Sequence, residues 1–139
     1  MTVPQRGPEY AAICALLRAS ALIVGEAERP MVDSRLSEAP YVVVYPSIID
    51  SITGPLDDLA ADTGSEYLVR SIGRSAIQAL AVADKARTVL LGNDLTIPDR
   101  SLMRPVEWAL AQEVDRDDDT TPPWFYLSER FIFWTTPNP

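Results

Sequence analysis

The sequence predicts a single α+β domain, in which two helices pack on a mainly antiparallel sheet of about four strands. Two segments repeat apolar residues at helical spacing, and four others have strand-like composition and are separated by turns. The length of 139 residues provides one hydrophobic core and leaves no room for a second. The expected order is helix, strand, strand, helix, strand, strand, within one domain covering residues 1–139.

The first helix is expected over residues 10–24. Pro8 precedes it, where a missing N–H costs no helical hydrogen bond, and Gly25 ends it. Its apolar residues recur at helical spacing: Tyr10, Ile13, Leu17, Ala21 and Val24. Residues 26–40 mix charge with proline and are expected to form a loop, with a short strand at Met31 and Val32.

Two strands are expected in the first half of the chain. Residues 41–45 are apolar on both faces, which indicates a strand that is central in the sheet or covered on two sides. Residues 47–65 are turn-rich and predict a long loop. Residues 66–72 form the second strand, which ends at Gly73.

The second helix has the strongest signals. Ser75 is a favourable N-cap with Gln78 three residues later, the spacing of a capping box, and Gly92 is placed to end the helix. Its apolar stripe is rich in alanine and predicts close packing on the sheet.

Two more strands are expected in the last third of the chain. Val106, Trp108 and Leu110 alternate with smaller or polar residues and predict a half-buried strand. Residues 113–123 are polar and predict a loop, and residues 124–136 form the last and longest strand.

The composition excludes several kinds of catalytic site. The chain has no histidine, so Ser-His-Asp and Cys-His sites and histidine-bound zinc are impossible. No glycine-rich phosphate-binding motif occurs. Cys14 is one helical turn from Tyr10 and Leu17 and is expected to be a small core residue. We therefore expect no enzyme activity and no cofactor.

The aspartate cluster at residues 115–119 is the strongest candidate for a metal site. Asp115, Asp117 and Asp119 match positions 1, 3 and 5 of a calcium-binding loop. The match fails at positions 6 and 12, where Thr120 and Tyr126 replace glycine and glutamate. A solvated turn is the expected structure, and no metal is expected.

Charge is distributed unevenly along the chain. The net charge of −8 argues against a broad surface for binding nucleic acid. Residues 50–66 carry five carboxylates and no basic residue, and residues 107–119 carry six carboxylates and one arginine. These segments are either ordinary solvated loops or parts of one acidic surface along which DNA can slide. No uncharged apolar run is long enough to cross a membrane.

The last strand has aromatic residues on both faces. One face carries Phe125, Leu127, Phe131 and Phe133, which suits a core. The other carries Trp124, Tyr126, Arg130 and Trp134, a composition typical of subunit contacts. The alternative is that a helix covers each face.

The order of these features resembles the tail terminators of long-tailed phages that infect actinobacterial hosts. The matching features, in chain order, are the strand at 40–46, Gly54 and Pro55, Tyr67, the strand end at 72–74, segments 83–87, 90–92 and 95–98, the aspartates within 116–119, and the aromatic segments 124–126 and 134–136. They extend over residues 40–136. Residues 47–51 depart from the pattern, because a glycine-rich turn is expected there.

The resemblance implies a structural virion protein at the tail–neck junction, assembled in the host cytoplasm. Such proteins form a homo-oligomeric ring, usually a hexamer, which caps the tail tube, ends its polymerisation and provides the docking surface for the head connector. The partners implied are further copies of the chain, the tail-tube protein and the head-closure or connector protein, while genomic DNA passes through without specific binding.

Two sets of residues are assigned to this role. Trp124, Tyr126, Arg130 and Trp134 are the candidate subunit contact. Asp57, Asp58, Asp62, Asp117, Asp118 and Asp119 are the candidate acidic lining of the channel. The nearest alternative is another neck component, such as a head-closure or head–tail connector protein. A more distant one is a small hydrolase that uses carboxylates, which would need a pocket with a carboxyl of raised pKa.

Overall fold

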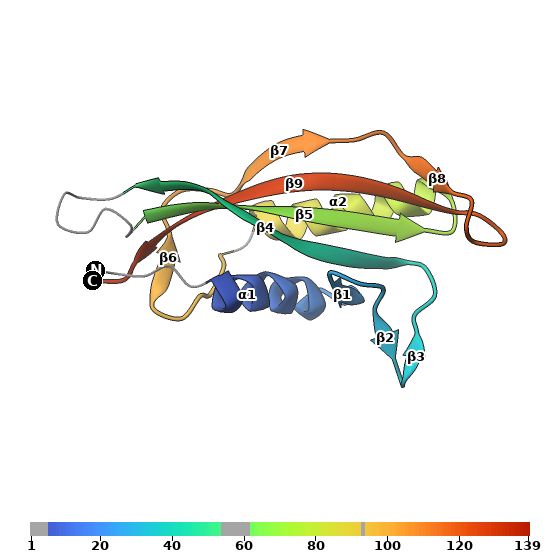
Figure 1. Ribbon diagram of the computed structural model, residues 1–139, viewed down its shortest axis with the longest axis horizontal. Helices are drawn as coiled ribbons and strands as arrows, with labels where there is room; N and C mark the ends of the chain where they lie inside the picture. Colours follow the sequence, from blue (N-terminus) through green and yellow to red (C-terminus); the bar gives the residue numbers. More distant parts are fainter. Residues whose placement is uncertain (1–5, 54–61, 93) are drawn as a thin grey trace.

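The computed structural model of the protein describes residues 6–53, 62–92 and 94–139 (Figure 1). Helix α1 (Arg6–Ala19) is followed by β1 (Val24–Glu26) and by a hairpin of β2 (Met31–Val32) and β3 (Arg35–Leu36). The long strands β4 (Tyr41–Thr53) and β5 (Asp62–Gly73) precede helix α2 (Ala76–Gly92). The short strands β6 (Arg100–Leu102), β7 (Glu107–Ala111) and β8 (Asp115–Asp117) lead to the long final strand β9 (Trp124–Pro137).

Within the described residues, seven strands form the main sheet, in the order β1-β4-β5-β9-β6, with β7 and β8 also paired to β9. Only β1 and β4 are parallel in this sheet. The α+β class, the two helices and the mainly antiparallel sheet are therefore confirmed, whereas the expectation of about four strands is wrong. β1, β6 and β8 have three residues each, too few for a repeat of apolar residues to be recognised.

Both helices contribute to one core on a single face of the main sheet. Val44 and Val69 are direct cross-strand partners, so their side chains lie on the same face, and both belong to this core. The core joins α1 and α2 to alternate residues of the long strands: Ile13, Leu17, Val82, Ala86, Val42, Tyr67, Phe131 and Phe133. The opposite face carries a smaller cluster of Ala39, Tyr41, Val43 and Ile72, which contains no helix residue.

Helix α1 ends at Ala19 and not at Val24. The amide of Leu22 donates to the carbonyl of Leu17 (3.4 Å) and that of Ala21 to Arg18 (3.1 Å), the hydrogen-bond pattern of a Schellman cap. Ala21 has φ of 64°, a left-handed conformation that glycine usually supplies. An alanine gives no sequence signal for such a cap, and the apolar residues continue at helical spacing to Val24. The predicted helix therefore extended too far, into β1.

Residues 47–65, which were expected to form a loop, are strand at both ends. β4 continues to Thr53 and β5 begins at Asp62. Shifts in the pairing register around Ile49 mark β-bulges, which hide the strand from a simple alternation pattern. Pro46 lies beyond the part of β4 that pairs with β1, so its missing N–H removes no hydrogen bond to that neighbour.

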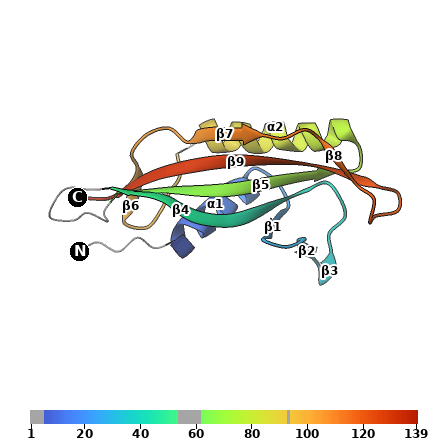
Figure 2. The same ribbon diagram turned by 45° about the horizontal axis from the view of Figure 1, so that its top comes forward.

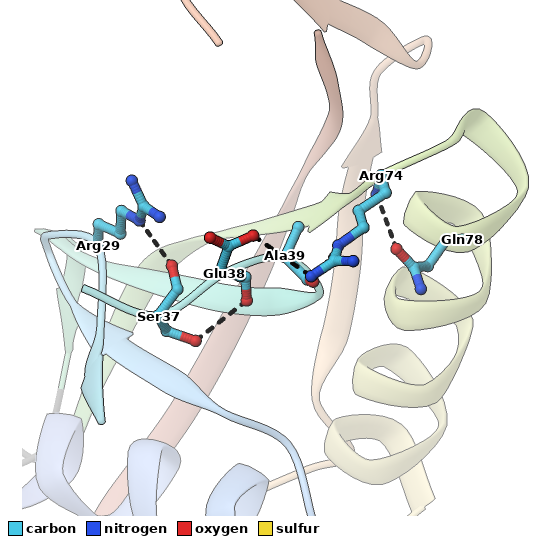
Figure 3. Close-up of polar contacts among 6 residues, drawn as sticks. All are labelled: Arg29, Ser37, Glu38, Ala39, Arg74 and Gln78. Atoms are coloured by element: carbon cyan, nitrogen blue, oxygen red, sulfur yellow. Dashed lines mark hydrogen bonds and ion pairs between the residues drawn. The ribbon is translucent and has the colours of Figure 1, made fainter. Parts of the chain in front are cut away.

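Helix α2 is confirmed with its cap. The amide of Gln78 donates to the hydroxyl of Ser75 (3.1 Å), and the side-chain oxygen of Gln78 accepts from the amide of Arg74 (2.7 Å; Figure 3). A Cβ at Gly73 would lie 2.4 Å from the amide nitrogen of Ala79, so only glycine allows the helix to start this close to β5.

The remaining elements agree with expectation in part. The short strand at Met31 and Val32, the strand that became β7 and the long last strand are all confirmed. β8 lies inside the segment 113–123 that was expected to be a loop. No helix in the described ranges is long and apolar enough to cross a membrane.

Candidate assembly surface

The four residues expected at a subunit contact lie on one face of β9. Trp124, Tyr126, Arg130 and Trp134 occupy even-numbered positions, and successive side chains of a strand alternate between faces. Phe131 points into the helix-covered core, so the four residues lie on the opposite side of the sheet. We call this side the open face; it also carries Tyr41, Val43, Tyr45, Arg70 and Ile72 from β4 and β5.

A groove of about 470 Å³ lies on one end of the open face. The guanidinium of Arg29 lies 4.8 Å from the ring centre of Trp124. That of Arg70 lies 5.0 Å from Tyr126 and 5.5 Å from Tyr45. Tryptophan, tyrosine and arginine are the residues most enriched among the energetically dominant residues of protein contacts, so this arginine–aromatic groove has the composition of such a contact.

Trp134 and Arg130 lie further along β9 and have partners within the subunit. The ring of Trp134 covers Gly64, where an added Cβ would be 2.9 Å from the ring carbons, and Arg104 lies 4.2 Å from the ring centre. Arg130 forms an ion pair with Glu66 at 3.2 Å. Trp134 therefore supports its own sheet, and its part in a subunit contact stays a prediction.

The acidic residues expected to line a channel lie in two places. Asp62 begins β5, next to Thr63, which pairs with Thr135 near the end of β9. Asp117 pairs with Trp124 at the beginning of β9. Eleven residues of strand separate these two points of β9, about 36 Å at 3.3 Å per residue. Asp62 and Asp117–Asp119 therefore form separate acidic regions in one subunit, while Asp57 and Asp58 lie outside the described residues.

The aspartates of 115–119 are engaged in local contacts at the rim of the arginine–aromatic groove. Asp117 accepts from the amide of Asp119 (3.0 Å), and Asp118 pairs with Arg116 (2.7 Å). Asp115 accepts from the hydroxyl of Tyr126 (3.2 Å), and this hydrogen bond raises the pKa of Tyr126. No group of three or more acidic or cysteine residues in the described ranges is arranged to hold a metal ion.

Thr120, at position 6 of the rejected calcium loop, closes this turn. Its hydroxyl donates to the carbonyl of Asp117 (3.1 Å) and accepts from the amide of Trp124 (2.7 Å). The segment is therefore a turn with its own hydrogen bonds, which leads the chain directly into β9.

Glu9 is a buried carboxyl that the sequence analysis missed. It is 2% exposed; Tyr67 donates to one of its oxygens (2.8 Å) and Thr135 to the other (3.5 Å). Burial raises the pKa of Glu9. It lies four residues before Ile13 and eight before Leu17 on the buried stripe of α1, the one signal that pointed to it. Its two hydrogen bonds join α1 to β5 and β9.

Cys14 is fully buried beside Ile13 and Leu17, as expected of a small core residue. Burial raises the pKa of its thiol, which disfavours the reactive thiolate.

Comparison with solved structures finds a similar fold. The chain superposes on a chain from a structure titled "Virion of native gene transfer agent (GTA) particle" with a TM-score of 0.69, covering 94% of this chain and 96% of the other at 17% identity. No family model matches, and neither does any curated protein. The protein shares its fold with a virion chain. At this identity the similarity establishes the fold alone.

Proposed function

We propose that the protein is a structural virion subunit that assembles, as a ring of six copies, on the end of a phage tail tube. One observation supports the proposal above all others: 94% of this chain superposes on 96% of a chain from a virion particle. In this role the ring ends tube polymerisation and provides the surface to which the head connector docks.

The open face is consistent with a ring subunit. A ring needs contacts between two different surfaces of the same chain, together with surfaces for the tube and the connector. The arginine–aromatic groove, whose lining includes Trp124 and Tyr126, supplies one surface of suitable composition. Asp117–Asp119 at its rim supply the negative charge expected near passing DNA.

Growth of the tail tube tests this function directly. Purified tail-tube protein is polymerised with and without this protein, and tube lengths are measured by electron microscopy. A terminator shortens the tubes in proportion to its concentration and is seen at one tube end. If tubes grow to the same length but their ends bind this protein together with a connector, the protein is a head-closure or connector component. Unchanged tubes with bare ends would contradict both roles.

A further inference from the structure

The β2–β3 hairpin projects from the rest of the chain (Figures 1 and 2). Several of its apolar side chains are exposed. Asp33 and Ser34 both have positive φ, 52° and 64°, the conformation of a type I′ turn. Met31 and Leu36 are cross-strand partners and are 62% and 57% exposed. A two-stranded hairpin gains little stability alone, so apolar residues exposed on it are better explained by a partner.

The base of the hairpin is fixed to the body. The Nε of Arg29 donates to the carbonyl of Ser37 (2.7 Å), and that of Arg74 donates to the carbonyl of Ala39 (2.9 Å; Figure 3). Arg74 also pairs with Glu38 at 3.4 Å. The hairpin is therefore held in one orientation before any partner binds, which lowers the entropic cost of association.

An apolar groove of about 650 Å³ lies between the hairpin and the first half of α2. We call it the hairpin groove; its apolar lining includes Leu22, Ile23, Leu36, Ala81 and Val82. Ile77, on the same half of α2, is 81% exposed. Lys85 also lines the groove and forms no ion pair with a described residue.

A second exposed apolar surface lies at the other end of α2. It includes Leu91 and Met103. Trp108 is also exposed, and its ring lies 4.7 Å from the guanidinium of Arg87, one helical turn before Leu91 on α2. We call Leu91, Met103 and Trp108 the helix-end cluster. Leu91, Met103 and Asp94 line a smaller groove of about 340 Å³. Arg104 lines it as well and pairs with Glu107 at 3.4 Å. Within the described ranges Asp94 also has no cationic partner. The two surfaces thus carry opposite unpaired charges beside exposed apolar side chains.

We infer that the hairpin groove of one subunit receives the helix-end cluster of the next copy, with Lys85 of one subunit facing Asp94 of the other. When each subunit binds the next through two different surfaces, an open row of subunits has one unused surface of each kind at its two ends. Closing the row into a ring pairs these last two surfaces. The inference rests on the proposed ring and specifies a subunit contact within it that does not use the open-face residues Trp124, Tyr126, Arg130 and Trp134.

Single substitutions on either surface test the contact. Leu36→Asp and Leu91→Asp each place a charge among apolar groups, and both side chains are exposed, so the fold should be retained. Each should weaken ring assembly by at least about tenfold, as expected for a desolvated contact residue. Ala15→Asp, on the exposed side of α1, adds the same charge elsewhere and should assemble like the parent. Assembly is followed by sedimentation, and folding by circular dichroism.

Charge reversal identifies the partner surface. Lys85→Glu and Asp94→Lys should each weaken assembly, and the double variant should restore most of it, since every subunit carries both halves of the contact. The experiment uses the purified protein alone, so assembly restored in the double variant identifies the partner as a second copy.

The outcomes separate this inference from the proposed function. If the parent forms a ring and the Leu36 and Leu91 variants form it equally well, the contact is wrong while the ring stands. If those variants form rings but no longer bind the tail tube, the hairpin groove serves the tube protein and the inference is overturned. If the parent forms no ring, alone or with tube protein, the proposed function and this contact both fail.

Discussion

At the scale of single residues, Glu9 shows how one buried charge can make stability depend on pH. Desolvation is the largest influence on this carboxyl and raises its pKa above the ordinary value of 4.5. The folded state therefore holds the Glu9 proton more tightly than the unfolded state. The resulting stabilisation is fully present below pH 4.5 and is lost as pH rises through the folded-state pKa.

Glu9→Gln should remove this pH dependence. The amide keeps hydrogen-bonding capacity toward Tyr67 and Thr135 but has no proton to lose. The measurement is the free energy of unfolding in urea across pH 4 to 8, where the parent should lose more stability than the variant as pH rises. Glu28→Gln, at an exposed carboxyl, serves as the control. Equal slopes for the parent and Glu9→Gln would contradict the account.

Trp134 should contribute to the stability of the subunit itself. Trp134→Ala uncovers Gly64 and removes the ring beneath Arg104, which should cost about 2 kcal/mol or more in unfolding free energy. Chemical denaturation measures this cost. A variant as stable as the parent would show that the ring supports nothing in the sheet. A folded variant that fails to assemble would identify Trp134 as a subunit contact as well.

The role of a residue was predictable where it depends only on which face of a strand or helix the side chain occupies. Strand alternation placed Trp124, Tyr126, Arg130 and Trp134 on one face, and helical spacing placed Cys14 in the core. The partners of Trp134 were not predictable, because Gly64 and Arg104 meet its ring only once the strand register is known. Glu9 was missed because carboxylates are rarely fully buried.

At the scale of elements, the turn after β8 should not bind calcium. Asp117 and Asp118 already have partners within the turn, and Thr120 closes it. The melting temperature should therefore be the same in calcium and in EDTA. A rise in melting temperature at micromolar calcium would overturn this expectation, since an ion that binds only the folded state must stabilise it.

Elements were predictable where a local signal was strong. α2 has both a capping box and a terminal glycine, and β9 has a long aromatic alternation. The short strands β1, β6 and β8 exist because a long neighbour offers hydrogen bonds, which is information that their own three residues do not contain. The end of α1 was not predictable, because Ala21 takes the left-handed conformation of the helix cap that a glycine usually provides.

At the scale of the whole molecule, the acidic residues should make ring assembly sensitive to salt. Six copies of Asp117–Asp119 around one axis repel one another, and the Debye length grows to about 30 Å at 0.01 M salt. The ring should therefore weaken at low ionic strength. Replacing Asp117, Asp118 and Asp119 with Asn should relieve this effect in sedimentation at varied salt. A ring that grows more stable as salt is removed would contradict an acidic channel lining.

The fold class was predictable for the whole molecule, but the arrangement of surfaces was not. Periodicity predicted two helices and an antiparallel sheet, yet it could not show that both helices cover the same face. The hairpin groove depends on contacts of Arg29 and Arg74 with residues 37–39, which come together only in the folded chain.

Ring formation is the central claim, and the native mass of the purified protein tests it most directly. The subunit has a mass of 15.3 kDa, so a six-membered ring has six times that mass, about 92 kDa. Native mass spectrometry or light scattering, on the protein alone and mixed with tail-tube protein, should detect this species. A protein that stays at 15.3 kDa under both conditions would contradict the account.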